Sequence, residues 1–203
     1  MSVVETIHDR YAHGRRCRIL SRHLADIIPE RFSVLDVGCG DGLLAREIAR
    51  ARPDISLRGI DVLGRARTHI PVDPFDGVTI PHDDGSFDGV MFIDVLHHST
   101  DPLSLLREGL RVARKSIVIK DHLCEGLFAD LTLRVMDRVG NARHGVSLPY
   151  NYWPKQRWIE AFDALGLRIE KWTTQLGIYP WPASWFFNRS LHFIARLDVA
   201  LPH

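Results

Sequence analysis

The residues best suited to chemistry lie in a short glycine-rich segment, residues 34–42 (VLDVGCGDG). Glycines at positions 38, 40 and 42 let the chain turn sharply and approach a ligand without a Cβ in the way. Acids stand in and beside the turn, at Asp36 and Asp41. A pyrophosphate prefers bare amide donors, whereas these carboxylates suit a ligand that carries positive charge. The segment therefore predicts a binding site for a cationic cofactor.

A dinucleotide site is the competing interpretation of the same segment. The dinucleotide fingerprint is G-x-G-x-x-G/A, in which the last small residue lets the helix pack closely. Counted from Gly38, that last position is Leu43, so the fingerprint is not met. S-adenosylmethionine carries an ammonium group and a sulfonium, and its charge complements Asp36 better than a dinucleotide would.

A second acid, Asp61, stands at the end of the next predicted strand. A carboxylate in that position can accept both hydroxyl groups of a ribose, and such charged hydrogen bonds contribute about 1.5–3 kcal/mol each. Val62 follows it and is expected to pack against the adenine face. A third acidic position, Asp76 with Gly77 beside it, comes shortly before the next strand.

Four polar residues follow later strands and could move a proton: His97, His98, Asp121 and His122. Methyl transfer needs a general base only when the acceptor must lose a proton, and histidine is the usual base near neutral pH. Histidines after a strand also cap helices or fill loops, so this structural alternative stays open for each of them.

The run His82-Asp83-Asp84 has residue types that bind metals. A solvated turn before a strand is the favoured explanation of the run, and no further ligands follow at metal-binding spacing. We therefore expect no metal site.

Hydrophobic periodicity places these residues at the junctions of alternating strands and helices. The predicted helices are 3–28, 43–50, 101–112, 124–139 and 154–165. The predicted strands are 32–38, 55–62, a short one within 71–77, 87–94, 116–120, 168–174 and 191–197. This alternation indicates an α/β fold with a doubly wound, mostly parallel sheet.

Composition limits the partners and the setting of the chain. Its 203 residues fit one domain, and 26 basic against 25 acidic residues give a formal net charge of +1. That charge provides no global attraction for nucleic acid or for an anionic membrane. The three cysteines are far apart, the N-terminal residues lack the apolar run of a signal peptide, and no apolar stretch approaches about 18 residues. We expect a cytoplasmic protein without a membrane anchor; its oligomeric state stays open.

Three segments in this order resemble the class I S-adenosylmethionine-dependent methyltransferases, in particular the small-molecule enzymes of the methyltransferase type 11-like group. They are VLDVGCGDG at 34–42, GIDV at 59–62 and IPHDDGSFDGVMFIDVLHH at 80–98. The resemblance covers residues 30–120 and implies a Rossmann-like sheet with an antiparallel last strand and helices on both faces. It departs from the family between Asp61 and Asp76, where only GRARTHIPVDPF stands in place of a full helix and strand. We expect a trimmed sheet edge there.

The resemblance implies roles for matched positions. The glycine loop would hold the methionine part of the cofactor, Asp61 the ribose and Asp76 the adenine amino group. The segment after the 87–94 strand would line the cofactor and the transfer site. The implied cofactor-binding residues are Asp36, Gly38, Cys39, Gly40, Asp61, Val62, Asp76, Gly77, Ile93, Asp94 and His97.

The resemblance also divides the single domain, 1–203, by role. The expected parts are an N-terminal helix (1–29), a cofactor-binding core (30–121), a segment shaping the acceptor pocket (122–166) and C-terminal strands (167–203). Aromatic and polar residues mix in HGVSLPYNYWP, as in ligand sites, although a loop that packs on the sheet would look the same. The expected acceptor-binding residues are Tyr11, Asn141, His144, Tyr150 and Tyr152.

The sequence therefore predicts an enzyme that transfers a methyl group from S-adenosylmethionine to a small molecule and releases S-adenosylhomocysteine. An RNA or protein methyltransferase is the alternative within the same class, and near-neutral charge counts against it. A cofactor-binding protein of this fold without catalysis would carry the same loop and acids, so the sequence does not separate it from the enzyme.

Overall fold

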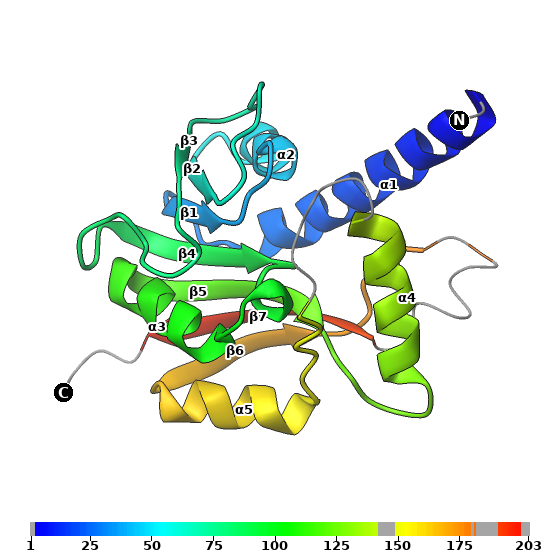
Figure 1. The fold of residues 1–203 in the computed structure, drawn as a ribbon. Helices are drawn as coiled ribbons and strands as arrows, with labels where there is room; N and C mark the ends of the chain where they lie inside the picture. The colour runs from blue at the N-terminus through cyan, green and yellow to red at the C-terminus, as the bar shows by residue number, and fades with distance from the viewer. Residues whose placement is uncertain (1–2, 142–148, 180, 182–190, 200–203) are drawn as a thin grey trace.

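The computed structural model describes residues 3–141, 149–179, 181 and 191–199. There the chain forms a seven-stranded sheet with helices on both faces (Figure 1). The strands are β1 (Ser33–Val37), β2 (Ser56–Asp61), β3 (Val72–Pro74), β4 (Phe87–Ile93), β5 (Ala113–His122), β6 (Leu167–Thr173) and β7 (His192–Val199). The helices are α1 (Val3–Ile27), α2 (Leu43–Ala51), the short 3₁₀ turn η1 (Leu96–His98), α3 (Pro102–Val112), α4 (Ala129–Asn141) and α5 (Lys155–Ala164).

The strand order is β3-β2-β1-β4-β5-β7-β6. Strands β3, β2, β1, β4 and β5 run parallel, and β7 runs antiparallel to both of its neighbours. The sheet begins with the central strand β1 and is extended outward to β3. The chain then returns to the centre at β4, so the switch point lies between β1 and β4. Open α/β sheets bind ligands at the carboxyl ends of the strands beside such a point. The predicted fold, including the antiparallel last strand, is confirmed.

Alternation along the central strands creates two separate cores, because successive side chains of a strand face opposite sides of the sheet. Val90 and Phe92 of β4 pack with side chains of α3 and α5 on one face. Met91, between them, packs with side chains of α1 and α2 on the other face. This double coverage fixes the strands that carry the predicted site residues.

The connection from β2 to β3, residues 62–71, contains no helix, as the shortened sequence predicts. The connection instead packs directly on the glycine loop: the His69 amide donates to the Asp41 carbonyl at 2.7 Å. A Cβ built on Gly42 would lie 2.5 Å from Ile70. The short connection thus packs directly against the glycine loop.

One predicted helix boundary is wrong. The sequence pattern places a helix over 124–139, but α4 begins only at Ala129. Gly126 (φ 89°) and Phe128 (φ 64°) have left-handed backbone conformations, which an α-helix does not accommodate. A turn therefore precedes α4, and α4 stands beyond the carboxyl ends of β4 and β5 (Figure 1).

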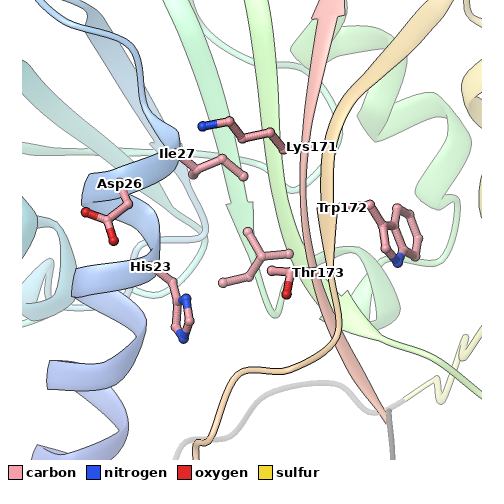
Figure 2. A pocket seen from close by; sticks show the side chains of 7 residues that line it. His23, Asp26, Ile27, Lys171, Trp172 and Thr173 are labelled. Carbon is pink, nitrogen blue, oxygen red and sulfur yellow. The ribbon is translucent and has the colours of Figure 1, made fainter.

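A hollow of about 380 Å³ lies between α1 and the β6–β7 edge (Figure 2). Its lining residues are His23, Asp26, Ile27, Lys171, Trp172, Thr173 and Ile194. None of them belongs to the predicted site. In the described part of the chain, no helix combines the length and apolar character needed to cross a bilayer.

The Arg52 side chain fastens the end of α1 to the turn after α2. Its guanidinium donates to the carbonyl oxygens of Ala25 (2.6 Å), Ile28 (2.9 Å) and Pro29 (3.3 Å). These carbonyls lie at or just past the end of α1, where no amide of the same helix can reach them. Asp54 holds the other edge of the guanidinium at 2.7 Å.

We predict that Arg52→Ala lowers the free energy of unfolding by about 1.5–3 kcal/mol, the usual value of hydrogen bonds to a charged group. Urea denaturation measures this change. Arg50→Ala is the matched control, because that side chain is 64% exposed and, among the described residues, its ion pair is with Glu47 at 3.1 Å. Equal stability of the two variants would show that the Arg52 contacts contribute nothing.

Candidate active site

The glycine loop connects β1 to α2 and has a left-handed backbone at each of its glycines. The φ angles of Gly38, Gly40 and Gly42 are 72°, 61° and 74°, values that side-chain-bearing residues rarely adopt. The space around them differs. A Cβ on Gly38 would lie 2.5 Å from Val95, whereas a Cβ on Gly40 would have no atom of the described residues within 4 Å. The loop is therefore packed at its first glycine and open at the second.

Asp61 holds the glycine loop in place. Its Oδ2 accepts a hydrogen bond from the Gly40 amide at 2.7 Å, and its Oδ1 accepts one from the Leu63 amide at 2.8 Å. The carboxylate is 8% exposed. Both oxygens keep further lone pairs, so the predicted contact with a ribose stays a prediction.

Asp36, at the end of β1, is buried beside Asp61. Burial, and then the charge of Asp61, raise the pKa of Asp36 well above its usual range. The pKa of the Cys39 thiol is also raised, chiefly by burial and then by the negative charges of Asp36 and Asp61. Among the described residues, neither carboxylate forms an ion pair with a lysine or arginine. A cation in the corner between Asp36, Asp61 and Gly40 would relieve the repulsion between the two acids.

Exposed apolar side chains lie beside this corner. Val62 is 56% and Val78 is 66% exposed, and a Cβ on Gly77 would be 3.3 Å from Val62. The turn at 76–78 is thus adjacent to the end of β2, as the predicted adenine contacts require. Asp76 is exposed, and its Oδ1 accepts from the amides of Val78 (2.7 Å) and Thr79 (2.8 Å). Its contact with the adenine stays a prediction.

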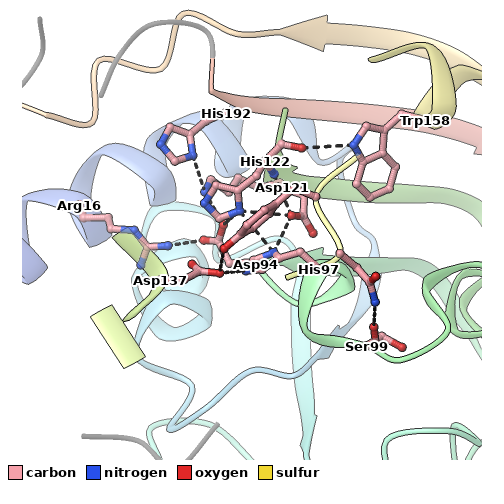
Figure 3. Close-up of polar contacts among 12 residues, drawn as sticks. Arg16, Asp94, His97, Ser99, Asp121, His122, Asp137, Trp158 and His192 are labelled. Atoms are coloured by element: carbon pink, nitrogen blue, oxygen red, sulfur yellow. Dashed lines mark hydrogen bonds and ion pairs between the residues drawn. The ribbon is translucent and has the colours of Figure 1, made fainter. Parts of the chain in front are cut away.

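A buried polar cluster lies at the carboxyl ends of β4 and β5 (Figure 3). His97 Nδ1 lies 2.6 Å from Asp121 Oδ1 and 3.3 Å from His122 Nδ1. The backbone amide of His122 donates to the same Asp121 oxygen at 2.7 Å. Three of the four predicted acid–base residues therefore touch one another, and the fourth, His98, has its ring centroid 4.0 Å from that of His97.

Asp94 joins this cluster to α1. It follows Ile93, the last residue of β4, and has a left-handed backbone with φ 55°. Its carboxylate accepts from the Arg16 guanidinium on one oxygen and from the Lys120 ammonium on the other. Burial raises the pKa of Asp94, but Lys120 and Arg16 outweigh it and hold this pKa well below its usual range.

The histidines of the cluster differ in charge. Burial lowers the pKa of His97, but Asp121 and Asp137 outweigh that effect and raise it to about 10. Burial, together with the charge of His97, lowers the pKa of His122, and the same two causes lower that of His98. At neutral pH, His97 therefore carries a proton on both nitrogens.

The predicted acceptor residues are described only in part. Tyr152 donates to Asp137, and its ring centroid lies 6.1 Å from that of Tyr150. Asn151 anchors both tyrosines, because its side chain donates to the Ser99 carbonyl at 2.7 Å and its amide to the His97 carbonyl at 3.2 Å. The side chains of Tyr11 and Asn141, and all of His144, lie outside the described residues.

The glycine loop and the polar cluster are neighbours. Val95, which packs on Gly38, stands one residue after Asp94 and two before His97 in the chain. Sequence reasoning missed three cluster members: Arg16, Lys120 and His192, whose Nδ1 lies 3.3 Å from the Lys120 ammonium. Lys120 could have been recognised from the sequence, because it is a charged residue directly after the apolar run Ile117–Ile119 of a central strand. Arg16 could not have been, because α1 carries several arginines.

Comparison with known proteins agrees with this geometry. A family model described as a methyltransferase domain matches residues 8–171. An uncharacterized methyltransferase of Mycobacterium tuberculosis is 41% identical over 80 residues, covering 36% of this chain and 41% of the relative. Ajmaline N-methyltransferase of Rauvolfia serpentina is 31% identical over 155 residues, covering 68% of this chain and 53% of that enzyme. The chain thus matches about half or less of the length of these relatives.

Solved structures share the fold. In a complex between the Haloferax volcanii Trm112 methyltransferase activator and a methyltransferase, the matched chain has a TM-score of 0.70 and 19% identity, with 97% of this chain and 96% of that one covered. A methyltransferase of Thermotoga maritima has a TM-score of 0.66 and 15% identity, with 98% and 96% covered. From the matched domain and the fold, the chain belongs to the class I S-adenosylmethionine-dependent methyltransferases.

Proposed function

We propose that this chain transfers the methyl group of S-adenosylmethionine to a small-molecule acceptor and releases S-adenosylhomocysteine. The observation that carries the proposal is the corner formed by Asp36, Asp61 and the open side of Gly40. Burial, and then the charge of Asp61, raise the pKa of Asp36 there, and neither acid pairs with a lysine or arginine among the described residues. The ammonium group of the cofactor would supply that charge, while Asp61 would accept the ribose hydroxyls.

The adenine would lie on Val62 beside the 76–78 turn. Covering exposed apolar side chains with a flat ring removes their surface from water, which favours binding. Val62 and Val78 are such exposed side chains. The remaining predicted cofactor contacts, at Cys39, Ile93 and Asp94, lie along the same carboxyl edge of β1 and β4.

The acceptor would be held where the glycine loop meets the polar cluster. Methyl transfer is an in-line displacement on carbon already activated by the sulfonium, so orientation is the protein's main contribution. If the acceptor must lose a proton, His98 and His122 are the candidate bases, because their lowered pKa values leave them unprotonated at neutral pH. His97, which is already protonated, and Asp121 would hold that base in position. Tyr11, Asn141, His144, Tyr150 and Tyr152 are the proposed acceptor contacts.

The relatives' names support a small molecule as acceptor. They include enzymes named for ajmaline, 27-O-demethylrifamycin SV and ubiquinone biosynthesis. A net charge of +1 also gives little electrostatic steering toward a nucleic acid. The free thiols of Cys17, Cys39 and Cys124 support a reducing, cytoplasmic setting.

We expect S-adenosylmethionine and S-adenosylhomocysteine to raise the melting temperature of the chain, whereas NAD leaves it unchanged. A ligand that binds only the folded state stabilises it by about 2.7 kcal/mol at a hundredfold excess over Kd. Thermal-shift measurements make this comparison. A shift with NAD alone would overturn the cofactor assignment, and turnover of a labelled methyl group distinguishes an enzyme from a binding protein.

Asp61→Asn is expected to weaken S-adenosylmethionine binding at least tenfold, which corresponds to about 1.4 kcal/mol. Isothermal titration calorimetry measures the affinity. Asp73→Asn is the matched control, because Asp73 lies one strand away, opposite Ile60, and pairs with Arg58 at 2.7 Å. Unchanged affinity in the Asp61 variant would rule out its ribose contact.

Asp36→Asn is expected to abolish cofactor binding without destabilising the ligand-free protein. Because burial raises the folded-state pKa of Asp36 above its unfolded value of about 3.9, ionisation favours the unfolded chain as pH rises above that value. The variant should therefore gain stability relative to the natural chain between pH 4 and pH 8. Urea titrations across this range measure the trend, and a relative loss of stability toward pH 8 would contradict it.

A further inference from the structure

The strongest unexplained feature of the polar cluster is one nitrogen of His97. Its Nε2 is fully buried and makes no hydrogen bond within the described residues. It lies 3.3 Å from Asp137 Oδ2, near enough for attraction but without hydrogen-bond geometry. Two ligands of a tetrahedral ion with bonds of about 2.1 Å stand about 3.4 Å apart. The separation fits two donor atoms that share a metal ion.

His97 is also oriented as a metal ligand usually is. Its other nitrogen, Nδ1, lies 2.6 Å from Asp121 Oδ1, so that proton is committed to the carboxylate and Nε2 is left to face Asp137. Metal-binding histidines commonly donate their second nitrogen to a carboxylate, which fixes the ring. Asp121, a buried acid with no exposed surface, would be this orienting group.

His98 supplies a third donor. Nitrogen atoms of His97 and His98 and an oxygen of Asp137 lie within 4.8 Å of one another. His97 is 1% and Asp137 7% exposed, whereas His98 is only partly buried. The site is therefore shielded on one side and reachable from solvent past His98.

A second grouping, Asp94 with His97 and His122, is also close enough to hold an ion. It is less suited to one, because Arg16 and Lys120 already neutralise Asp94. It would also need His97 Nδ1, which Asp121 occupies. Around Nε2, by contrast, the carboxylates of Asp121 and Asp137 both face the His97 ring.

We propose that His97 Nε2, His98 and Asp137 bind a divalent transition-metal ion of the zinc type. Two imidazoles and a carboxylate suit such ions, and three protein ligands leave a coordination position open. Resting on the proposed function, the open position would take an oxygen or nitrogen of the acceptor beside the methyl donor. The acceptor class would then be molecules with a metal-coordinating hydroxyl or amine.

The test is metal binding by the full chain after EDTA treatment and dialysis. Isothermal titration calorimetry with zinc chloride gives stoichiometry and affinity, and the visible absorption of added Co²⁺ reports nitrogen and oxygen coordination. The site variants are His98→Ala, at a partly exposed position, and the isosteric Asp137→Asn. The control is His82→Ala, which removes the histidine next to two other acids, Asp83 and Asp84.

One zinc per chain is expected, with binding at least tenfold weaker in both site variants and unchanged in the control. No stoichiometric binding by the natural chain, equal binding in the site variants, or a loss only in His82→Ala would each overturn the proposal. S-adenosylmethionine affinity is measured separately on the same proteins. Failure to bind the cofactor would contradict the proposed function, while zinc binding would decide the metal site independently.

Discussion

The candidate site depends on the contact between the Asp61 carboxylate and the Gly40 amide. This hydrogen bond joins the end of β2 to the loop that leaves β1, and the Leu63 amide completes it on the other oxygen. A buried backbone amide needs an acceptor. The Gly38 and Gly42 amides find backbone carbonyls, at Ile60 and Cys39, and Asp61 provides the acceptor for Gly40.

The carboxyl edge of the sheet contains two groups of acids, which differ in whether positively charged side chains pair with them. Asp36 and Asp61 have no cationic partner among the described residues. Asp94 is neutralised by Arg16 and Lys120, and Asp121 by protonated His97. A buried charge is costly unless it is paired, which is why we propose a cationic ligand for the first group. In the second group, Asp94 has its own cationic partners, whereas Asp121 and Asp137 both face His97.

Much of the fold could be predicted because its determinants are local. The glycines at 38, 40 and 42 predicted positive φ, and the apolar run 87–94 predicted a central strand. The polar cluster could be predicted only in part. His97, His98, Asp121 and His122 follow strands whose carboxyl ends must meet, but Arg16 reaches Asp94 across 78 positions of sequence. Such a contact depends on how α1 crosses the sheet, which periodicity does not determine. The start of α4 was missed because Phe128 adopts a left-handed backbone without being glycine.

The helix-free connection between β2 and β3 links the edge of the sheet to whatever occupies the glycine loop. The His69 amide of this connection donates to the Asp41 carbonyl, and the Ile70 side chain packs on Gly42. Strand β3 pairs with β2 over three residues. Small, weakly paired edges open more readily than a sheet centre. Occupancy of the loop would therefore slow amide exchange in β3, and loss of the ligand would let this edge of the sheet open more often.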